Sequence, residues 1–244
     1  MKVIGVIPAR FASTRFPGKP LKLIADKPLL QWVIEGSKTS TLINELIVAT
    51  DDERIAALSE KCGVRAIMTD SSLPTGTDRI WAAIKDKNFD IAINIQGDEP
   101  LITGGILDTL VNSLLEHPES EMGTLGHPFH DQKDIENPNI IKIVLNQNNQ
   151  AVYFSRFPIP HSRVKEFSQD SNLQHIGLYG YRKAFLKKFC ETPATALEIN
   201  EGLEQLRALY LGAKIQVTSV EYETRGVDEP QDVLIVEKKL SERG

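Results

Sequence analysis

Three cationic side chains lie in the loop that follows the first apolar run of the chain. Residues 3–7 are aliphatic or glycine, a proline ends the run, and Arg10, Arg15 and Lys19 follow. Guanidinium and ammonium groups gathered this closely can neutralise several charges on one ligand, as a triphosphate requires. The loop therefore favours phosphate binding, with a solvated basic loop as the alternative.

The same loop offers backbone groups that suit an anion. N–H groups around Ser13, Thr14 and Gly18 can cradle phosphate oxygens as a nest. The segment is not a P-loop, because Ser13 stands where the first glycine is needed and Pro20 where the metal-binding hydroxyl is needed. A Gly-x-Gly-x-x-Gly fingerprint is also missing after every expected strand, which disfavours an NAD-dependent dehydrogenase.

Two aspartates follow glycines in similar short turns. Asp98 lies in "QGDEP" directly after an apolar run, and Asp228 lies in "RGVDEP". Gly97 would let a ligand approach the backbone closely. Carboxylate and phosphate oxygens together are ligands that Mg²⁺ prefers, so we expect Asp98 and Asp228 to hold Mg²⁺ beside a triphosphate. The alternative for Asp98 is an N-terminal cap on a helix beginning near residue 103.

Composition and charge narrow the class of protein. The chain has 244 residues, a net charge of −5 and a pI of about 5.6, which disfavours a nucleic-acid partner. The N-terminal apolar run is too short for a signal peptide, and we see no membrane-spanning stretch in the sequence. Cys62 and Cys190 form no metal or redox motif. We expect a cytoplasmic protein without membrane insertion.

The first half of the chain alternates between buried strands and amphipathic helices. Thr50-Asp51-Asp52-Glu53 has the pattern of a capping box, and Gly63 suits the left-handed end of the helix that follows. We expect strands at 2–7, 45–49, 64–68 and 90–95, and helices at 28–38, 53–63 and 77–86. This rhythm predicts a parallel sheet with helices on its faces.

The second half has a mixed pattern. Residues 140–145 and 150–155 flank "NQNN" and predict a β-hairpin, which is our candidate for a dimer surface. We further expect strands at 173–181 and 214–220, and helices at 196–211 and 230–241. The fold class is therefore α/β, a Rossmann-like, mostly parallel sheet flanked by helices, with an antiparallel excursion at about 125–185. Ligands of such sheets bind beyond the carboxyl ends of the strands.

Eight motifs in register carry a resemblance to a known family. They are "IPARFASTRFPGKPL", "VATDDERI", "MTDSSLPTGTDRI", "NIQGDEP", "NPNIIKIV", "YFSRFPIP", "HIGLYGYR" and "LEQLRALYLG". Together they span nearly the whole chain, which closely resembles the 3-deoxy-manno-octulosonate cytidylyltransferases, the CMP-Kdo synthetases of Gram-negative lipopolysaccharide synthesis. The resemblance implies a single nucleotidyltransferase domain over 1–244, whose excursion at 125–185 serves sugar binding and dimerisation.

The resemblance also implies an activity and a set of site residues. The reaction would join CTP and Kdo into CMP-Kdo and diphosphate, with Mg²⁺ as cofactor and a homodimer as the assembly. It implies nucleotide binding by Arg10, Ser13, Arg15, Lys19, Thr75, Gly76 and Arg79. It implies catalysis by Lys19, Asp98 and Asp228, with both aspartates on the metal. It implies sugar binding by Gln96, Arg156, His175, Tyr179, Glu204 and Gln205.

Some of these roles have simpler alternatives in the sequence itself. Arg156 can meet a sugar carboxylate bidentately or can be a surface arginine at a strand end. His175 can be a satisfied structural residue. Glu204 and Gln205 can belong to a solvated helical face, although their mix of donors and acceptors suits hydroxyl recognition.

The sequence departs from the family pattern in two places. "LEINEG" stands before "LEQLR", where a histidine or similar polar residue is expected, and Gly202 inside a helix costs about 1 kcal/mol relative to Ala. "LPTGT" replaces the commoner "xSGT". The open alternatives are a cytidylyltransferase for a related sugar acid, 8-amino-Kdo or sialic acid, and a non-catalytic nucleotide-binding regulator.

Overall fold

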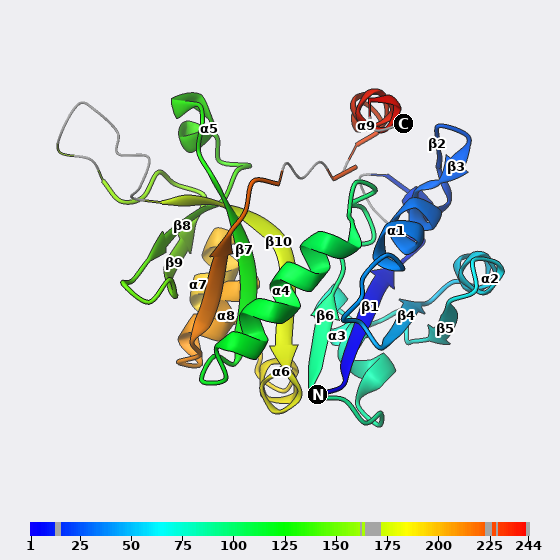
Figure 1. Cartoon of the computed structure of the whole chain (residues 1–244), viewed down its shortest axis with the longest axis horizontal. Helices are drawn as coiled ribbons and strands as arrows, with labels where there is room; N and C mark the ends of the chain where they lie inside the picture. Colours follow the sequence, from blue (N-terminus) through cyan, green and yellow to red (C-terminus); the bar gives the residue numbers. More distant parts are fainter. Residues whose placement is uncertain (13–15, 162, 164–171, 223–225, 228, 243–244) are drawn as a thin grey trace. The chain divides into compact units, whose positions relative to one another are not determined.

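The computed structural model describes residues 1–244 except 13–15, 162, 164–171, 223–225, 228 and 243–244. Its internal contacts divide the chain into two compact units (Figure 1). The first unit comprises Met1–Asp108 with Thr224–Gly244, and the second comprises Thr109–Glu223. Because this division reflects contacts alone, it does not test the expected single domain with an excursion at about 125–185. That expectation stays a prediction.

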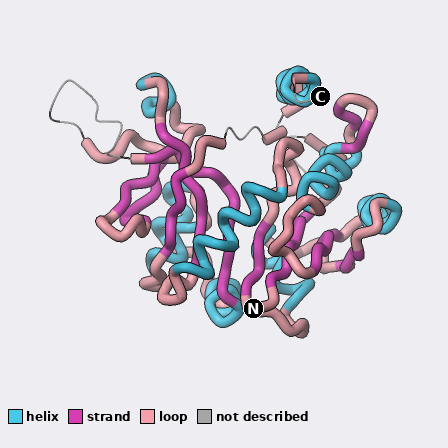
Figure 2. Tube along the Cα trace, viewed as in Figure 1, coloured by secondary structure: helices cyan, strands magenta, loops and turns pink. Residues whose placement is uncertain are grey.

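The first unit contains a four-stranded parallel ladder in the order β6-β1-β4-β5. The strands are β1 (Val3–Ala9), β4 (Glu45–Thr50), β5 (Arg65–Met68) and β6 (Ile91–Asn94). Strand β1 is buried along nearly its whole length because it lies between two neighbours under helices, which explains its unbroken apolar sequence. All four expected strands are confirmed (Figure 2).

Helices accompany this ladder. They are α1 (Leu29–Ser37), α2 (Glu53–Lys61), α3 (Gly76–Ile84) and α9 (Asp232–Ser241), and α4 (Gly104–Glu116) runs through the division between the units. Helices α1, α2, α3 and α9 confirm the expected helices, and α4 is the helix that the alternative reading of Asp98 placed near residue 103. Within the described residues, no helix combines the length and the apolar character that crossing a membrane requires.

The ends of α2 correct one prediction and confirm another. Its N-cap is Asp52, whose side chain accepts a hydrogen bond from the Arg54 amide, so the capping box drawn from Thr50 to Glu53 is wrong. Thr50 instead belongs to β4. Gly63 adopts φ +71°, the left-handed conformation expected at the helix end.

A small apolar cluster fixes the loop that precedes α1. The loop contains the 3₁₀ turn η1 (Lys19–Leu21) and the hairpin of β2 (Leu23–Ile24) and β3 (Lys27–Pro28). The buried members of the cluster are Phe16, Ile24, Leu29, Leu101, Val227 and Val236. Helix α9 lies beside the hairpin, where the Ala25 amide donates to Glu237 (Figure 1). The described part of the basic loop from Phe16 onward is therefore anchored by this packing.

The second unit contains a mixed sheet. Strand β7 (Met122–Pro128) pairs in parallel with β11 (Ile215–Ser219) and antiparallel with β10 (Leu173–Arg182). Strands β8 (Lys142–Leu145) and β9 (Ala151–Ser155) form the expected hairpin, and β8 pairs with β10. The antiparallel part predicted from the sequence is confirmed.

The helices of the second unit were less predictable. The expected helix at 196–211 is two helices, α7 (Ala196–Glu201) and α8 (Gln205–Tyr210), because Gly202 adopts φ +63° and ends the first. Gly202 is thus a helix end, and the cost assigned to it inside a helix does not apply. Strand β7 and the helices α5 (Gln132–Glu136) and α6 (Lys183–Cys190) were not predicted from the sequence.

Candidate functional site

An ion pair joins the basic loop of the first unit to the turn after β6. The Lys19 Nζ atom donates to Asp98 Oδ2 at 2.7 Å, and the two side chains keep 14% and 30% of their surface exposed. Both were predicted, and the structure brings them together. Because neither charge is fully buried, both can exchange this contact for a ligand at modest desolvation cost.

The backbone around Asp98 is fixed on two sides. The Val227 amide donates to the Asp98 carbonyl at 2.9 Å. A Cβ at Gly97 would lie 2.8 Å from the Pro8 carbonyl oxygen, so the glycine is required where the turn passes β1. The alternative of Asp98 as a helix cap is wrong, because the Gly104 amide at the start of α4 donates to Thr39 Oγ1 instead.

The start of α3 carries three predicted nucleotide-binding residues. Thr75 is the N-cap: its hydroxyl accepts from the Asp78 amide and donates to the Asp78 carboxylate. Gly76 is the first residue of the helix. Arg79 is 3% exposed and donates to Asp51 Oδ2 at 2.9 Å.

Arg79 is therefore held in a buried ion pair rather than directed at solvent. Its second Nη atom donates to Thr69 Oγ1 at 2.6 Å. Asp51 was not predicted as its partner, although "VATDDERI" contains it and an acidic residue at the end of a parallel strand was an available signal. A contact of Arg79 with a nucleotide stays a prediction.

Some of the remaining predicted residues of the first unit are described by the structure, and others are not. Arg10 directly follows β1 and is exposed, and Gln96 precedes the Asp98 turn and is partly buried. The Gly18 amide donates to the Phe11 carbonyl, so that amide is used inside the loop. Ser13, Arg15 and Asp228 lie outside the described residues.

The donor chemistry of the Asp98 turn fits a magnesium ion. Its carboxylate is a hard oxygen ligand, and 30% of the side chain is exposed, which leaves room for phosphate and water oxygens. One of its oxygens meets the Lys19 ammonium. A hard cation at this carboxylate would therefore share it with Lys19 or displace that contact.

The second unit holds Arg156 in a different way. Its Nε, Nη1 and Nη2 atoms donate to the carbonyls of Glu201, Pro138 and Gly202 at 2.7, 3.0 and 3.4 Å. The Glu201 carboxylate accepts from the Arg156 amide at 2.9 Å and from the Ser155 hydroxyl at 2.7 Å. Three N–H groups of the guanidinium thus face backbone oxygens, and the other two of its five have no partner among the described residues.

A buried lysine completes this arrangement. Lys142 is fully buried, and its ammonium donates to the carbonyls of Asn137, Ile140 and Arg156 at 3.0, 2.7 and 2.5 Å. Burial lowers the pKa of Lys142, opposed by the nearby Glu201 carboxylate. Lys142 was not predicted as a functional residue, although a lysine between isoleucines in "NPNIIKIV" was a signal.

His175 lies on β10 beside a bulge. The register with β7 shifts between Ile176 and Tyr179, and the Thr124 hydroxyl donates to the Leu178 carbonyl there at 2.8 Å. Since that hydroxyl has given its proton to a carbonyl, His175 Nε2, 3.1 Å away, must be the donor to it. The neutral ring then presents Nδ1 as an acceptor. Thr124 was not predicted.

Burial also sets the charge of this ring. Although the residue as a whole keeps some exposure, the His175 ring packs against Phe154 and Tyr179 at centroid distances of 5.1 and 5.3 Å. Burial lowers the pKa of His175 to about 3. Burial, with a smaller contribution from the Glu204 carboxylate, raises the pKa of Tyr179 far above its usual value. Both side chains are neutral at pH 7.

Glu204 and Gln205 lie at the start of α8. Gln205 is 4% exposed, and its Nε2 has no hydrogen-bond partner among the described residues. A buried amide donor without a partner is costly, so it suits a ligand oxygen. Glu204 lies close enough to Tyr179 to influence its pKa. The solvated helical face considered for these residues is therefore wrong for Gln205.

The chain is similar to several known proteins. A family model described as cytidylyltransferase matches residues 4–215. The 3-deoxy-manno-octulosonate cytidylyltransferase of Bdellovibrio bacteriovorus is 52% identical, with all of both chains covered. That of Thermodesulfovibrio yellowstonii is 46% identical over 99% of each chain.

A solved structure shares both the fold and much of the sequence. It is a CMP:2-keto-3-deoxy-manno-octonic acid synthetase complexed with CTP, which is 36% identical and covers the whole of both chains with a TM-score of 0.94. This match confirms the nucleotidyltransferase fold expected from the sequence. By sequence and by structure, the chain belongs to the 3-deoxy-manno-octulosonate cytidylyltransferase family.

Proposed function

We propose that the protein transfers the cytidylyl group of CTP to Kdo, giving CMP-Kdo and diphosphate for lipopolysaccharide biosynthesis. The observation that carries the proposal is the partly exposed Lys19–Asp98 pair in a chain of this family. Such a pair offers a cation for a polyphosphate and a carboxylate for its counter-ion within one hydrogen bond. The solved relative complexed with CTP supports the choice of nucleotide.

Lys19 has the central role at the nucleotide. Its ammonium stabilises negative charge that develops on the phosphates as diphosphate leaves, and Arg10 with Arg15 adds to the same field. The attacking group is the anomeric hydroxyl of Kdo, which loses its proton to solvent and bonds to the α-phosphorus while the bond to diphosphate breaks. We propose Thr75, Gly76, Arg79 and Ser13 as further contacts of the nucleotide.

Asp98 and Asp228 would hold Mg²⁺. When bound, the ion neutralises phosphate charge and lowers the pKa of the attacking hydroxyl. Asp98 contributes a hard oxygen ligand whose position is fixed by the Val227 amide and by the close passage of Gly97. Titration of the metal-free protein with Mg²⁺, at saturating CTP and Kdo, tests this requirement, and full turnover without added Mg²⁺ in EDTA would exclude it.

The sugar acid would be recognised by hydrogen-bond donors and by hydrogen-bond acceptors. The two available N–H groups of Arg156 suit its carboxylate. Neutral His175 offers an acceptor at Nδ1, Tyr179 offers a hydroxyl, and Gln205 offers the unpartnered Nε2. Glu204 and Gln96 add acceptors for the sugar hydroxyls.

One incubation tests the activity. The protein, CTP and Mg²⁺ are mixed with Kdo, with 8-amino-Kdo or with sialic acid, and the products are read by mass spectrometry. We expect CMP-Kdo as the main product. A main product from either other sugar acid would favour a sister cytidylyltransferase, and CTP binding without any product would favour a nucleotide-binding regulator.

We also propose a cytoplasmic homodimer. The hairpin at 140–155 is our candidate for its surface, and Val152 on β9 keeps 56% of its surface exposed there. Light scattering after size-exclusion chromatography should give twice the 27.2 kDa chain mass. A Val152→Lys variant should elute as a monomer, and an unchanged dimer would place the interface elsewhere.

A further inference from the structure

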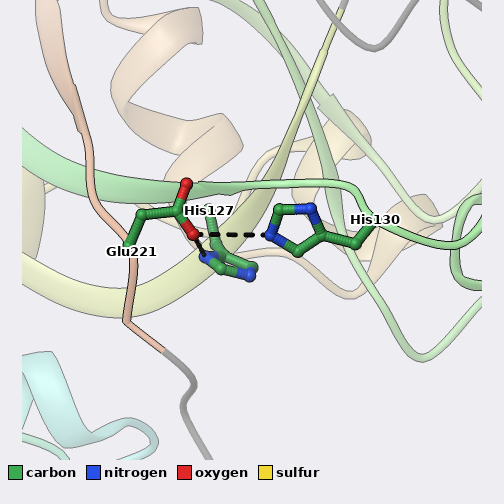
Figure 3. Close-up of side chains that lie close together, drawn as sticks. All are labelled: His127, His130 and Glu221. Carbon is green, nitrogen blue, oxygen red and sulfur yellow. Dashed lines mark hydrogen bonds and ion pairs between the residues drawn. The ribbon is translucent and has the colours of Figure 1, made fainter.

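Three metal-ligating side chains gather in the second unit, outside every residue that the proposed function uses. They are His127, His130 and Glu221, and one ligand atom from each lies within 4.8 Å of the others (Figure 3). Glu221 Oε2 is 3.4 Å from His130 Nε2 and 3.8 Å from His127 Nδ1. We propose that these three residues form a binding site for Zn²⁺ or a similar imidazole-preferring divalent metal.

The two separations that involve Glu221 suit a tetrahedral ion. Bonds of about 2.0–2.1 Å at tetrahedral angles place neighbouring ligand atoms about 3.4 Å apart. The Glu221–His130 separation already has this value, and the Glu221–His127 separation needs to shrink by only a few tenths of an ångström. The rings are steeply inclined, at 75° with centroids 5.0 Å apart, so both can direct a nitrogen toward Glu221 (Figure 3).

The backbone holds the ligands in place. His127 lies on β7, whose neighbour Gly126 pairs with Ser219 of β11, and the Val220 amide donates to the Gly126 carbonyl at 2.9 Å. The segments that carry His127 and Glu221 are therefore adjacent in one ladder. His130 follows the buried Phe129, so its position is set by the core. A site on such supports needs little rearrangement to bind an ion.

The choice of metal follows from the donors. Two imidazoles with one carboxylate favour Zn²⁺, Cu²⁺, Ni²⁺ or Co²⁺ over Mg²⁺, which prefers oxygen ligands. His130 and Glu221 are 65% and 72% exposed, so water can take a fourth position. His127 Nδ1 lies 3.0 Å from the Val220 carbonyl and carries a proton there. Binding of the metal at Nδ1 would replace that hydrogen bond and move the proton to Nε2.

The register also separates this cluster from the sugar-binding candidates. His127 pairs with Gln174, whereas His175 pairs with Gly126. Because successive side chains of a strand point to opposite faces, His127 and His175 lie on opposite faces of this ladder. The proposed site can therefore stabilise the ends of β7 and β11 without occupying the His175 face.

Calorimetric titration of the full, EDTA-treated protein with Zn²⁺, in excess Mg²⁺, tests the proposal. We expect one Zn²⁺ per chain and at least about a tenfold loss of affinity in His130→Ala and in Glu221→Gln. Both side chains are exposed, so neither change should unfold the protein, which circular dichroism checks. His161→Ala, at an exposed histidine outside the cluster, is the matched control and should bind as the wild type does.

A second readout follows unfolding. Zn²⁺ that binds only the folded state should raise the melting temperature of the wild type and of His161→Ala, but not that of His130→Ala. Absence of saturable Zn²⁺ binding would overturn the proposal. Equal binding by His130→Ala and the wild type would overturn it as well, because the metal would then be held elsewhere.

Discussion

Lys19 and Asp98 of the first unit are held in a different way from Arg156 and Lys142 of the second. Lys19 and Asp98 meet in a pair that keeps part of both side chains in solvent. Arg156 directs three nitrogens to backbone carbonyls, and Lys142 directs its buried ammonium to three more. The first arrangement can change partners readily, whereas the second ties charge to the shape of the backbone.

This contrast separates two kinds of mutational effect. Removing a partly exposed charge such as Asp98 leaves few buried groups unsatisfied, so it should alter the rate and leave stability nearly unchanged. Removing a charge that serves backbone carbonyls leaves buried acceptors without donors and should lower stability. The following predictions test this division, beginning with the largest expected effect.

Asp98→Asn should abolish most turnover. The amide keeps the size of the side chain but loses the charge that would hold Mg²⁺ and orient Lys19, so we expect kcat to fall by about 1,000-fold or more. Diphosphate release measures the rate, and urea unfolding measures the stability, which should change by less than about 0.5 kcal/mol. Asp86→Asn, at an exposed aspartate of the same unit, is the control. Near-normal rates would remove Asp98 from the mechanism.

Lys19→Ala should cost about 2–4 kcal/mol of transition-state stabilisation, or about 30- to 1,000-fold in kcat/KM for CTP. The ammonium is the group that we propose meets the phosphates. Lys22→Ala changes an exposed lysine at the end of the same 3₁₀ turn and should keep normal kinetics. If both variants lost activity equally, the general positive charge of the loop would matter more than the position of Lys19.

His175 predicts a pH dependence of stability in the second unit. Its folded-state pKa of about 3 is below the usual value near 6.5, so the unfolded chain binds the proton more readily. The contribution of His175 to the free energy of unfolding is then fully present above pH 6.5. It falls by up to about 1.4 kcal/mol per pH unit as the pH drops toward 3. Between pH 6.5 and 5, we expect the wild type to lose about 2 kcal/mol.

Urea unfolding of His175→Gln isolates this contribution. The variant should lose the slope between pH 6.5 and 5, and His161→Gln, at an exposed site, should retain it. Restricting the measurement to this range limits interference from carboxylates, which titrate mainly below pH 5. Parallel pH profiles for His175→Gln and the wild type would show that the ring is not desolvated in the folded protein.

The sequence predicted elements best where one periodicity continued for the whole element. The unbroken apolar run at 3–7 identified β1, and "NQNN" between two apolar runs identified the β8–β9 hairpin. The expected helix at 196–211 was wrong because its apolar spacing continues across Gly202. Only the backbone shows that this glycine adopts a left-handed conformation and ends α7.

Pairings between distant residues were the least predictable part of the candidate site. Only the approach of the basic loop to Asp98 could be expected, from the rule that ligands bind where strand ends of a parallel sheet meet; the Lys19–Asp98 ion pair itself was not predicted. Nothing in the local sequence around Arg79 or Arg156 specifies Asp51 or Glu201 as a partner, because these contacts depend on tertiary packing. The His127, His130 and Glu221 cluster joins segments distant in sequence for the same reason.

Arg156→Lys should have a smaller, mixed effect. Lysine keeps the charge but cannot reach three carbonyls and a carboxylate with a planar fork. We expect a loss of about 1–2 kcal/mol in stability and about a tenfold rise in KM for Kdo. Arg163→Lys, at an exposed arginine, should change neither quantity. A loss of stability with an unchanged KM would show that Arg156 serves the backbone alone.

Gly202→Ala should have the smallest effect, and it tests how far the backbone around Arg156 depends on one helix end. A Cβ at Gly202 would lie 3.9 Å from Arg156 Nε and Nη2, an ordinary contact, so the cost of about 1 kcal/mol comes from φ +63° alone. Gly177→Ala in β10 meets open space at an ordinary φ and should lose no stability. Because the Gly202 carbonyl accepts from Arg156, a shift of this helix end should raise KM for Kdo together with the loss of stability. If stability falls while KM stays constant, the end of α7 does not position Arg156 for the sugar. Effects on stability and effects on substrate binding would then be separate within the second unit as well.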